Sequence, residues 1–191
     1  MPEFLLKVEG TIHTLSTPWV MGILNITPDS FFEGSRFSSA EKAAQRAEEM
    51  IADGAKIIDI GGYSSRPGAD AVSPEEEWQR LESVIPAVRA VVDKHPGTFI
   101  SVDTFRASVA EKAVGAGAHM VNDISGGNLD DRMYEVVAKL QVPYIIMHMQ
   151  GDPSTMQINP TYEHVTQDIV KFFSEKLPQL HAMGIHDTIV D

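Results

Sequence analysis

Six short apolar runs recur along the chain and constrain its fold more than any other feature. They are rich in valine and isoleucine, and the segments between them carry apolar residues at helical spacing. The runs are 20-VMGILNI, 56-KIIDIGG, 99-FISVD, 119-HMVNDI, 143-PYIIMHM and 188-TIV. This alternation of strand and helix patterns predicts an α/β fold built from βαβ units.

The helical segments carry several start and stop signals. Ser38 with Glu41, and Ser73 with Glu76, have the spacing of a capping box, in which each residue satisfies a free backbone N–H of the other. Pro86 is expected to kink or split the second helix. The sequence predicts helices over 38–55, 73–92, 104–115, 130–141 and 162–184.

The strands are almost entirely apolar, which indicates a parallel sheet covered on both faces. No G-x-G-x-x-G turn follows the first strand, so a dinucleotide-binding fold is disfavoured. Each strand ends in a polar residue: Asn25, Asp59, Asp103, Asn122, His148 and Asp191. In a (β/α)8 TIM barrel these carboxyl ends meet at one mouth, where the active site lies. We predict such a barrel as a single domain over 1–191, with about six βα units and the sequence ending at the sixth strand.

Composition and charge exclude several classes of function. The chain has 191 residues, no cysteine, and 15 Lys and Arg against 27 Asp and Glu, which gives a net charge of −12. This charge repels nucleic acid and anionic membranes, and the absence of cysteine excludes a disulfide framework. The N-terminus lacks the pattern of a signal peptide, and no apolar run is long enough to span a membrane. We expect a cytoplasmic protein.

Each of the polar strand ends also has a structural explanation. Asp103 is a possible N-cap of the next helix, Asn122 with Asp123 suits a turn, and His148 between two methionines suits a core position. One mouth lined by Asp103, Asn122 and Asp191, however, offers an acceptor, a donor and acceptor, and a second acceptor. This series fits a flat heterocycle with adjacent ring N–H and amino groups.

Five motifs resemble the dihydropteroate synthase family, in order and along essentially the whole sequence. They are 22-GILNITPDSF, 59-DIGGYSSRPGA, 101-SVDT, 121-VNDISGG and 146-IMHMQGDPSTMQ. The resemblance implies a folate-pathway transferase, the target of sulfonamides. Such an enzyme condenses 7,8-dihydropterin-6-ylmethyl diphosphate with p-aminobenzoate and gives 7,8-dihydropteroate and diphosphate. The resemblance also implies Mg2+ as cofactor, and a homodimer for the full-length form.

The resemblance further assigns roles to individual residues. Asp103, Asn122 and Asp191 match the residues that grip the pterin, and Met147 either packs on the ring face or is an ordinary core methionine. Asn25 matches the residue that meets the magnesium and the diphosphate, and 26-ITPDSFFEGSRF resembles a loop that closes over the site. Ser65 and Arg66 match phosphate-binding residues of the second loop. No residue is assigned as acid or base, because an arylamine nucleophile is already neutral at pH 7.

The sequence also departs from the family. Ser65 stands where the family usually has Thr, and Tyr63 stands where Glu is common. The hydroxyl survives at Ser65, whereas the role of Tyr63 stays open. The family's Lys and Arg-x-His on strands seven and eight have no counterpart in these 191 residues, so we expect residues 1–191 alone to be inactive.

Two alternative functions stay open at this point. A pterin-binding methyltransferase domain would share the Asp and Asn residues, although 25-NITPDS and 64-SSRPG suit a diphosphate that a methyl donor lacks. The other alternative is a non-catalytic pterin-binding fragment, in which incomplete closure of the barrel would leave sheet edges open.

Overall fold

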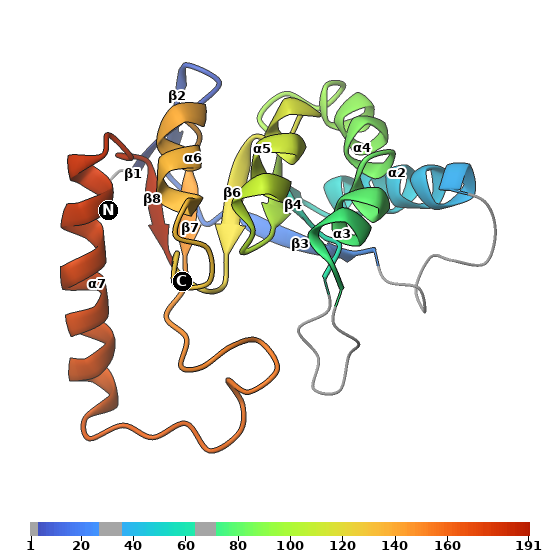
Figure 1. Ribbon diagram of the computed structural model, residues 1–191. Coiled ribbons are helices and arrows are strands. Elements are labelled where there is room, and N and C mark those ends of the chain that lie inside the picture. The colour runs from blue at the N-terminus through green and yellow to red at the C-terminus, as the bar shows by residue number, and fades with distance from the viewer. Residues whose placement is uncertain (1–3, 27–35, 64–71) are drawn as a thin grey trace.

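The computed structural model describes residues 4–26, 36–63 and 72–191, and it shows one parallel sheet with helices outside it (Figure 1). The six strands of this sheet lie in chain order, and every neighbouring pair is parallel. They are β3 (Val20–Asn25), β4 (Ala55–Gly61), β5 (Phe99–Asp103), β6 (Met120–Asp123), β7 (Tyr144–Ile146) and β8 (Thr188–Val190). This order confirms the predicted α/β fold with about six strand–helix units of a TIM barrel.

Helices connect the strands at the predicted places. They are α2 (Arg36–Ala52), α3 (Pro74–Leu81), α4 (Val84–Val92), α5 (Ala107–Gly115), α6 (Met133–Leu140) and α7 (Val165–Ala182). The capping box at Ser73 is confirmed: its hydroxyl accepts from the Glu76 N–H at 3.2 Å, and its own N–H donates to the Glu76 carboxylate at 2.9 Å.

Two helix boundaries refine the predictions. Pro86 splits the second helical segment into α3 and α4, and it lies in the first turn of α4, where its missing N–H leaves no hydrogen bond unmade. The predicted cap at Ser38 is wrong, because α2 already begins at Arg36. Arginine has a high helix propensity, which favours a helix that begins two residues before Ser38.

Successive side chains of each strand point to opposite faces of the sheet. The outward side chains form the main core with the helices; this core includes Leu24, Ile58, Ile60, Ile100, Val102, Val121, Tyr144 and Ile146. Inward side chains near the amino ends form a second apolar cluster, which includes Ile57, Phe99, Met120 and Ile145. The inward side chains near the carboxyl ends are polar instead. The interior is therefore apolar near the amino ends of the strands and polar near their carboxyl ends.

A β-hairpin that the sequence analysis did not predict covers the amino ends of the strands. It consists of β1 (Phe4–Val8) and β2 (Thr11–Leu15), joined at Glu9 and Gly10, which both have positive φ. Leu6 and Val8 are buried in the inward apolar cluster. The hairpin therefore closes one end of the sheet interior and leaves the carboxyl ends for a site.

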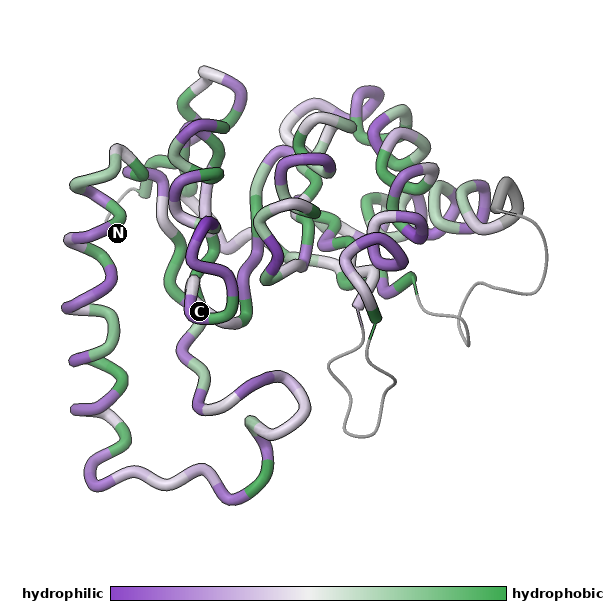
Figure 2. Tube along the Cα trace, in the orientation of Figure 1, coloured by the Kyte–Doolittle hydropathy of each residue, from purple (hydrophilic) through white to green (hydrophobic). Residues whose placement is uncertain are grey.

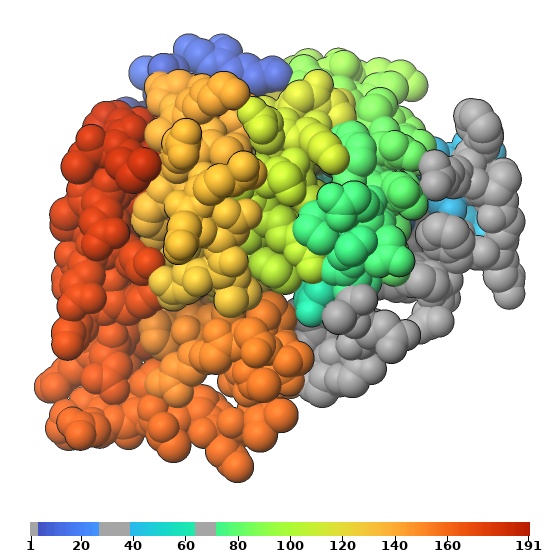
Figure 3. Space-filling view, in the orientation of Figure 1, coloured from blue at the N-terminus to red at the C-terminus, as the bar shows by residue number. Residues whose placement is uncertain are grey.

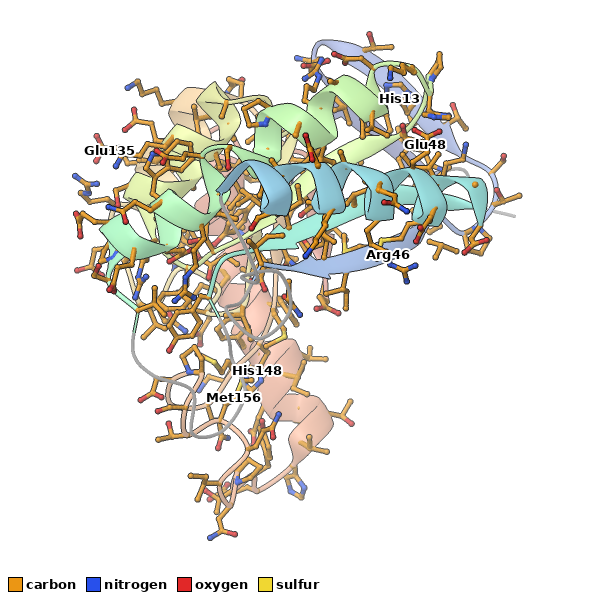
Figure 4. The ribbon with its side chains drawn as sticks, turned by 90° about the vertical axis from the view of Figure 1, so that its right-hand side faces the viewer. His13, Arg46, Glu48, Glu135, His148 and Met156 are labelled. Carbon is orange, nitrogen blue, oxygen red and sulfur yellow. The ribbon has the colours of Figure 1, made fainter. Side chains whose placement is uncertain are left out.

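A long connection without helix or strand runs from residue 147 to residue 164. Its atoms are coloured orange in Figure 3 and lie at the bottom of that view. It lies on the side where the carboxyl ends of the strands lie, and His148 and Met156 are far from His13 of the hairpin (Figure 4). Helix α7 follows, with hydrophilic and hydrophobic residues alternating along it (Figure 2). Among the helices of the described ranges, none is long and apolar enough to cross a membrane.

Candidate functional site

The register of the sheet brings the predicted site residues into one layer. Asn25 of β3 pairs with Gly61 of β4, Gly61 pairs with Asp103 of β5, and Asp103 pairs with Asn122 of β6. Because paired residues of parallel strands point to the same face, all of these side chains point inward. The sheet therefore places the predicted metal residue beside the predicted pterin residues.

Gly61 leaves a small space between two of these side chains. A Cβ at this position would lie 3.1 Å from Asn25 Oδ1 and 3.3 Å from Asp103 Oδ2. Those distances are tighter than ordinary van der Waals contacts, so any larger residue would push against both oxygens. The glycine therefore lets these two side-chain oxygens lie close together at the mouth.

Asp59 lies one inward position deeper than Gly61 on β4, and it is 5% exposed. The Asn122 amide donates to Asp59 Oδ2 at 3.1 Å, whereas Asp59 Oδ1 and the hydroxyl of the neighbouring Ser101 have no hydrogen-bond partner among the described residues. Burial raises the pKa of Asp59, and the negative charge of Asp191 adds to this effect. The floor of the mouth thus holds buried polar atoms that a ligand or water can satisfy.

Asp103 also has a strongly perturbed carboxyl group. Burial, followed by the negative charges of Asp59, Glu77 and Asp123, raises its pKa to about 8. A carboxyl group in such a position gains most from a ligand that brings N–H donors, because these donors compensate the charge.

The remaining predicted residues of the described ranges lie around the same mouth. Asp191 follows β8, and its N–H donates to the carbonyl of Ile146 at 3.0 Å. Met147 is half-buried directly after β7, and its N–H donates to the carbonyl of Asp123 at 3.3 Å. His148 is half-buried, and its ring packs against Tyr162 and Phe172.

Other predicted residues fall outside the described ranges. Ser65 and Arg66 lie in 64–71, and most of the loop that begins at Ile26 lies in 27–35. The roles assigned to Ser65 and Arg66 stay predictions.

The turn suggested by Asn122 with Asp123 is confirmed, but sequence reasoning missed the buried hydrogen-bond network of Asp123, the last residue of β6. Its buried carboxylate accepts from the backbone N–H groups of Ser125 and Gly127, each at 2.8 Å, from the Ser125 hydroxyl at 2.7 Å and from the Tyr144 hydroxyl at 2.6 Å. These bonds fix the turn 124–128 directly after Asn122. The Asp-x-Ser spacing of an Asx turn was the available signal.

Comparisons with known proteins agree with this geometry. The family model described as "Pterin binding enzyme" matches residues 21–191. The chain belongs to the pterin-binding enzyme family. It is 49% identical over 168 residues to the mitochondrial folate synthesis bifunctional protein of Pisum sativum, and 45% identical over 171 residues to the dihydropteroate synthase of Haemophilus influenzae. A solved structure of Xanthomonas albilineans dihydropteroate synthase with 4-aminobenzoic acid matches with a TM-score of 0.85 and 37% identity.

These pterin-binding relatives are longer than the chain. The alignments cover 87% of this chain and 32% of the pea protein, and 90% of this chain and 60% of the Haemophilus protein. The Xanthomonas structure covers 100% of this chain, which corresponds to 66% of that protein. The chain therefore spans less than two thirds of these relatives.

The raised pKa of Asp103 predicts a dependence of stability on pH. The unfolded carboxyl group ionises near its ordinary pKa of about 3.9, whereas the folded one ionises at about 8. The folded state is therefore penalised as pH rises from about 4 to 8, and the penalty stays constant above that. We expect Asp103→Asn, which removes this penalty, to gain on the order of 4 kcal/mol relative to wild type between pH 5 and pH 8.

Urea unfolding at several pH values measures this difference, with the exposed Asp53→Asn as the control for the substitution itself. A difference between Asp103→Asn and wild type that is the same at every pH would contradict the assignment.

Proposed function

We propose that the protein carrying this chain is a dihydropteroate synthase, and that residues 1–191 form its pterin-binding domain. The observation that carries the proposal is the inward group of acceptors at the carboxyl ends of β4 to β6, in which Asp59, Asp103 and Asn122 face one mouth. The identities to dihydropteroate synthases support the same reaction. The reaction joins a pterin diphosphate to p-aminobenzoate.

Pterin recognition follows from the hydrogen-bonding groups of the mouth. The 2-amino-pyrimidinone edge of a pterin presents N–H donors, and a carboxylate accepts them. We assign this role to Asp103, while the Asn122 amide both donates and accepts along the ring. Asp191 contributes a second acceptor from the other side of the mouth, and Met147 contacts the ring face.

The chemistry requires little from the protein beyond binding and charge. The C–O bond between the pterin methylene and the diphosphate breaks, and the electron pair leaves with the diphosphate. The amine of p-aminobenzoate forms the new C–N bond and releases a proton to water. The chain orients the pterin through Asp103 and Asn122, and we propose that Ser65 and Arg66 hold the leaving phosphate oxygens.

The described residues fit Mg2+ as a cofactor that takes few protein ligands. Asn25 Oδ1 is a hard oxygen donor beside the space at Gly61. Within the described ranges there is no cluster of three or more His, Cys, Asp or Glu residues arranged for a metal. Mg2+ commonly keeps several waters and binds substrate phosphates, so Asn25 suffices as a protein ligand. When bound, the ion supplies positive charge to the leaving diphosphate.

Several relatives are known with ligands that match this proposal. Structures of the Xanthomonas albilineans enzyme contain 4-aminobenzoic acid in one case and 7,8-dihydropteroate in another, and a Yersinia pestis dihydropteroate synthase was solved with a sulfonamide drug. By similarity we propose p-aminobenzoate as the second substrate and sulfonamides as inhibitors. None of these relatives supports the methyltransferase alternative.

We also propose that the full-length protein is a homodimer in the cytoplasm. Val165, Val170 and Met183 of the α7 region are exposed, which is typical of a helix that gains a partner. Sedimentation of the full-length protein should give the mass of two copies. A monomer at micromolar concentration would contradict the dimer.

Pterin binding tests the proposed function directly. We expect Asp103→Ala to lose roughly 30- to 900-fold in affinity for a dihydropterin, which corresponds to about 2–4 kcal/mol, because the donors of the pterin edge lose their acceptor. Calorimetry measures the affinity, and Asp53→Ala is the matched control because it removes an exposed carboxylate. Unchanged affinity in Asp103→Ala would rule out pterin binding at this mouth.

Metal dependence tests the role of Asn25. We expect EDTA to weaken binding of pterin diphosphate, and Asn25→Ala to raise the Mg2+ concentration for half-maximal binding about tenfold, since one ligand is lost. Titration of Mg2+ at fixed pterin diphosphate measures this concentration, with the exposed Asn128→Ala as control. If Asn25→Ala and Asn128→Ala respond alike, Asn25 is not a metal ligand.

A further inference from the structure

Tyr144 lies behind the mouth, on the outer face of the sheet. It is the first residue of β7, which lies beside β6 (Figure 1), and it is 0% exposed in the main core. Its hydroxyl donates to Asp123 Oδ2 at 2.6 Å. Burial, followed by the negative charge of Asp123, raises the pKa of Tyr144 well above its ordinary value, so the hydroxyl keeps its proton and remains a donor.

This hydrogen bond ties the turn after β6 to the neighbouring strand. Among the described residues, the other donors to the Asp123 carboxylate belong to the turn itself, namely the N–H and hydroxyl of Ser125 and the N–H of Gly127. Both groups of Ser125 reach Oδ1, whereas Gly127 and Tyr144 share Oδ2. Loss of the Tyr144 hydroxyl would therefore leave a buried carboxylate oxygen with a single donor from the described residues, which is a costly arrangement.

The orientation of Asp123 also affects Asn122, the residue before it. Consecutive residues of a strand point to opposite faces, so Asp123 points to the outer face and Asn122 into the mouth. The Asn122 amide donates to Asp59 Oδ2 at 3.1 Å, and the Asn122 carbonyl accepts from the Thr104 N–H at 2.9 Å. Both bonds depend on the backbone of β6, because the backbone fixes the place of the Cβ and the direction of the carbonyl. A rotation of the backbone at Asp123 would therefore move the Asn122 amide within the mouth.

A second tyrosine holds the same turn at a point farther from Asn122. The Tyr134 hydroxyl donates to the carbonyl of Gly126 at 2.7 Å, and the rings of Tyr134 and Tyr144 pack edge to face with centroids 5.9 Å apart. The hydrogen bond of Tyr144 ends on the residue next to Asn122, whereas that of Tyr134 ends farther along the turn. The two hydroxyls therefore separate the contribution of the Asp123 carboxylate from that of the turn as a whole.

We propose that Tyr144 is a positioning residue for the pterin: its hydroxyl holds the Asp123 carboxylate, and Asp123 in turn holds the Asn122 amide where it meets the pterin edge. This inference rests on the proposed function. Tyr144 lies on the outer face of the sheet, so it acts through β6 and does not touch the ligand. A binding group must stay within roughly 0.5 Å of its productive position, and residues behind the site provide this precision.

A double-mutant cycle between Tyr144→Phe and Asn122→Ala tests the coupling. Calorimetry of the full-length protein with 6-hydroxymethyl-7,8-dihydropterin measures the affinities. We expect Tyr144→Phe to weaken binding about tenfold in the wild-type background and less than about twofold in the Asn122→Ala background, because the amide that Tyr144 orients is then absent. Equal weakening in both backgrounds would show that the hydroxyl does not act through Asn122 and would overturn the proposal.

Tyr134→Phe is the matched control, because it removes a buried tyrosine hydroxyl from the same turn and leaves the donors of the Asp123 carboxylate in place. Both variants keep the ring that packs in the core, so both should fold, as urea unfolding verifies. We expect Tyr134→Phe to bind the pterin within about twofold of wild type. Equal losses in Tyr134→Phe and Tyr144→Phe would assign the effect to the turn as a whole and contradict the role of Tyr144.

A spectroscopic measurement tests the positioning without a ligand. Isotopic labelling of asparagine nitrogen makes the side-chain amides visible in nuclear magnetic resonance, and the pair of signals that disappears in Asn122→Ala belongs to Asn122. We expect this pair to shift or broaden in Tyr144→Phe and to stay unchanged in Tyr134→Phe. An unchanged pair in Tyr144→Phe would overturn the proposal. If wild type does not bind the pterin although the pair responds as expected, the proposed function fails while the link from Tyr144 to Asn122 stands, so the two failures are distinguishable.

Discussion

Two carboxylates that face the interior of the sheet, Asp59 and Asp103, impose the strongest constraint on this structure. Burial raises the pKa of both groups, and the charge of Asp59 adds to the shift at Asp103. Inward-facing carboxylates are costly unless hydrogen bonds satisfy them, and within the described residues only part of this need is met, by the Asn122 amide on Asp59. A ligand that brings several N–H donors would meet the rest. The mouth is thus arranged for such a ligand at some cost in stability, as is common in functional sites.

The rest of the fold keeps these groups in place. On the same inward faces, the amino halves of the strands hold an apolar cluster, and the hairpin covers it with Leu6 and Val8. Phe99 stacks on Trp19 with centroids 5.5 Å apart, two residues before Ser101 and four before Asp103 on the same strand. Since the strands are continuous, rigid packing at the amino ends fixes the carboxyl ends. The turn after β6, fixed by Asp123, and the hydrogen bonds of Arg106 to Glu77 and to the carbonyl of Val72 extend this rigidity beyond the strands.

The sequence predicted the strands, their parallel order and the mouth, because apolar runs and polar strand ends are local patterns. It did not predict the hairpin, since its turn places Glu9 at positive φ, which is uncommon for a residue other than glycine. Ser101 was hidden, because it is a single polar residue within a run that looked uniformly apolar. The contacts of Arg106 with Glu77 and Val72 join residues 29 and 34 positions apart, and no local pattern indicates such side-chain pairs. Asn122 was predicted to meet the pterin. Its hydrogen bond to Asp59 could not be predicted, because it depends on the register of β4, β5 and β6.

A crystal structure of the chain with bound 6-hydroxymethyl-7,8-dihydropterin tests the central claim most directly. The account predicts that the amino-pyrimidinone edge contacts Asp103 and Asn122, with the hydroxymethyl group directed toward Asn25. It would be contradicted by a pterin bound elsewhere, for example in the cavity of about 320 Å³ at the amino end that His13, Arg89 and His119 help to line.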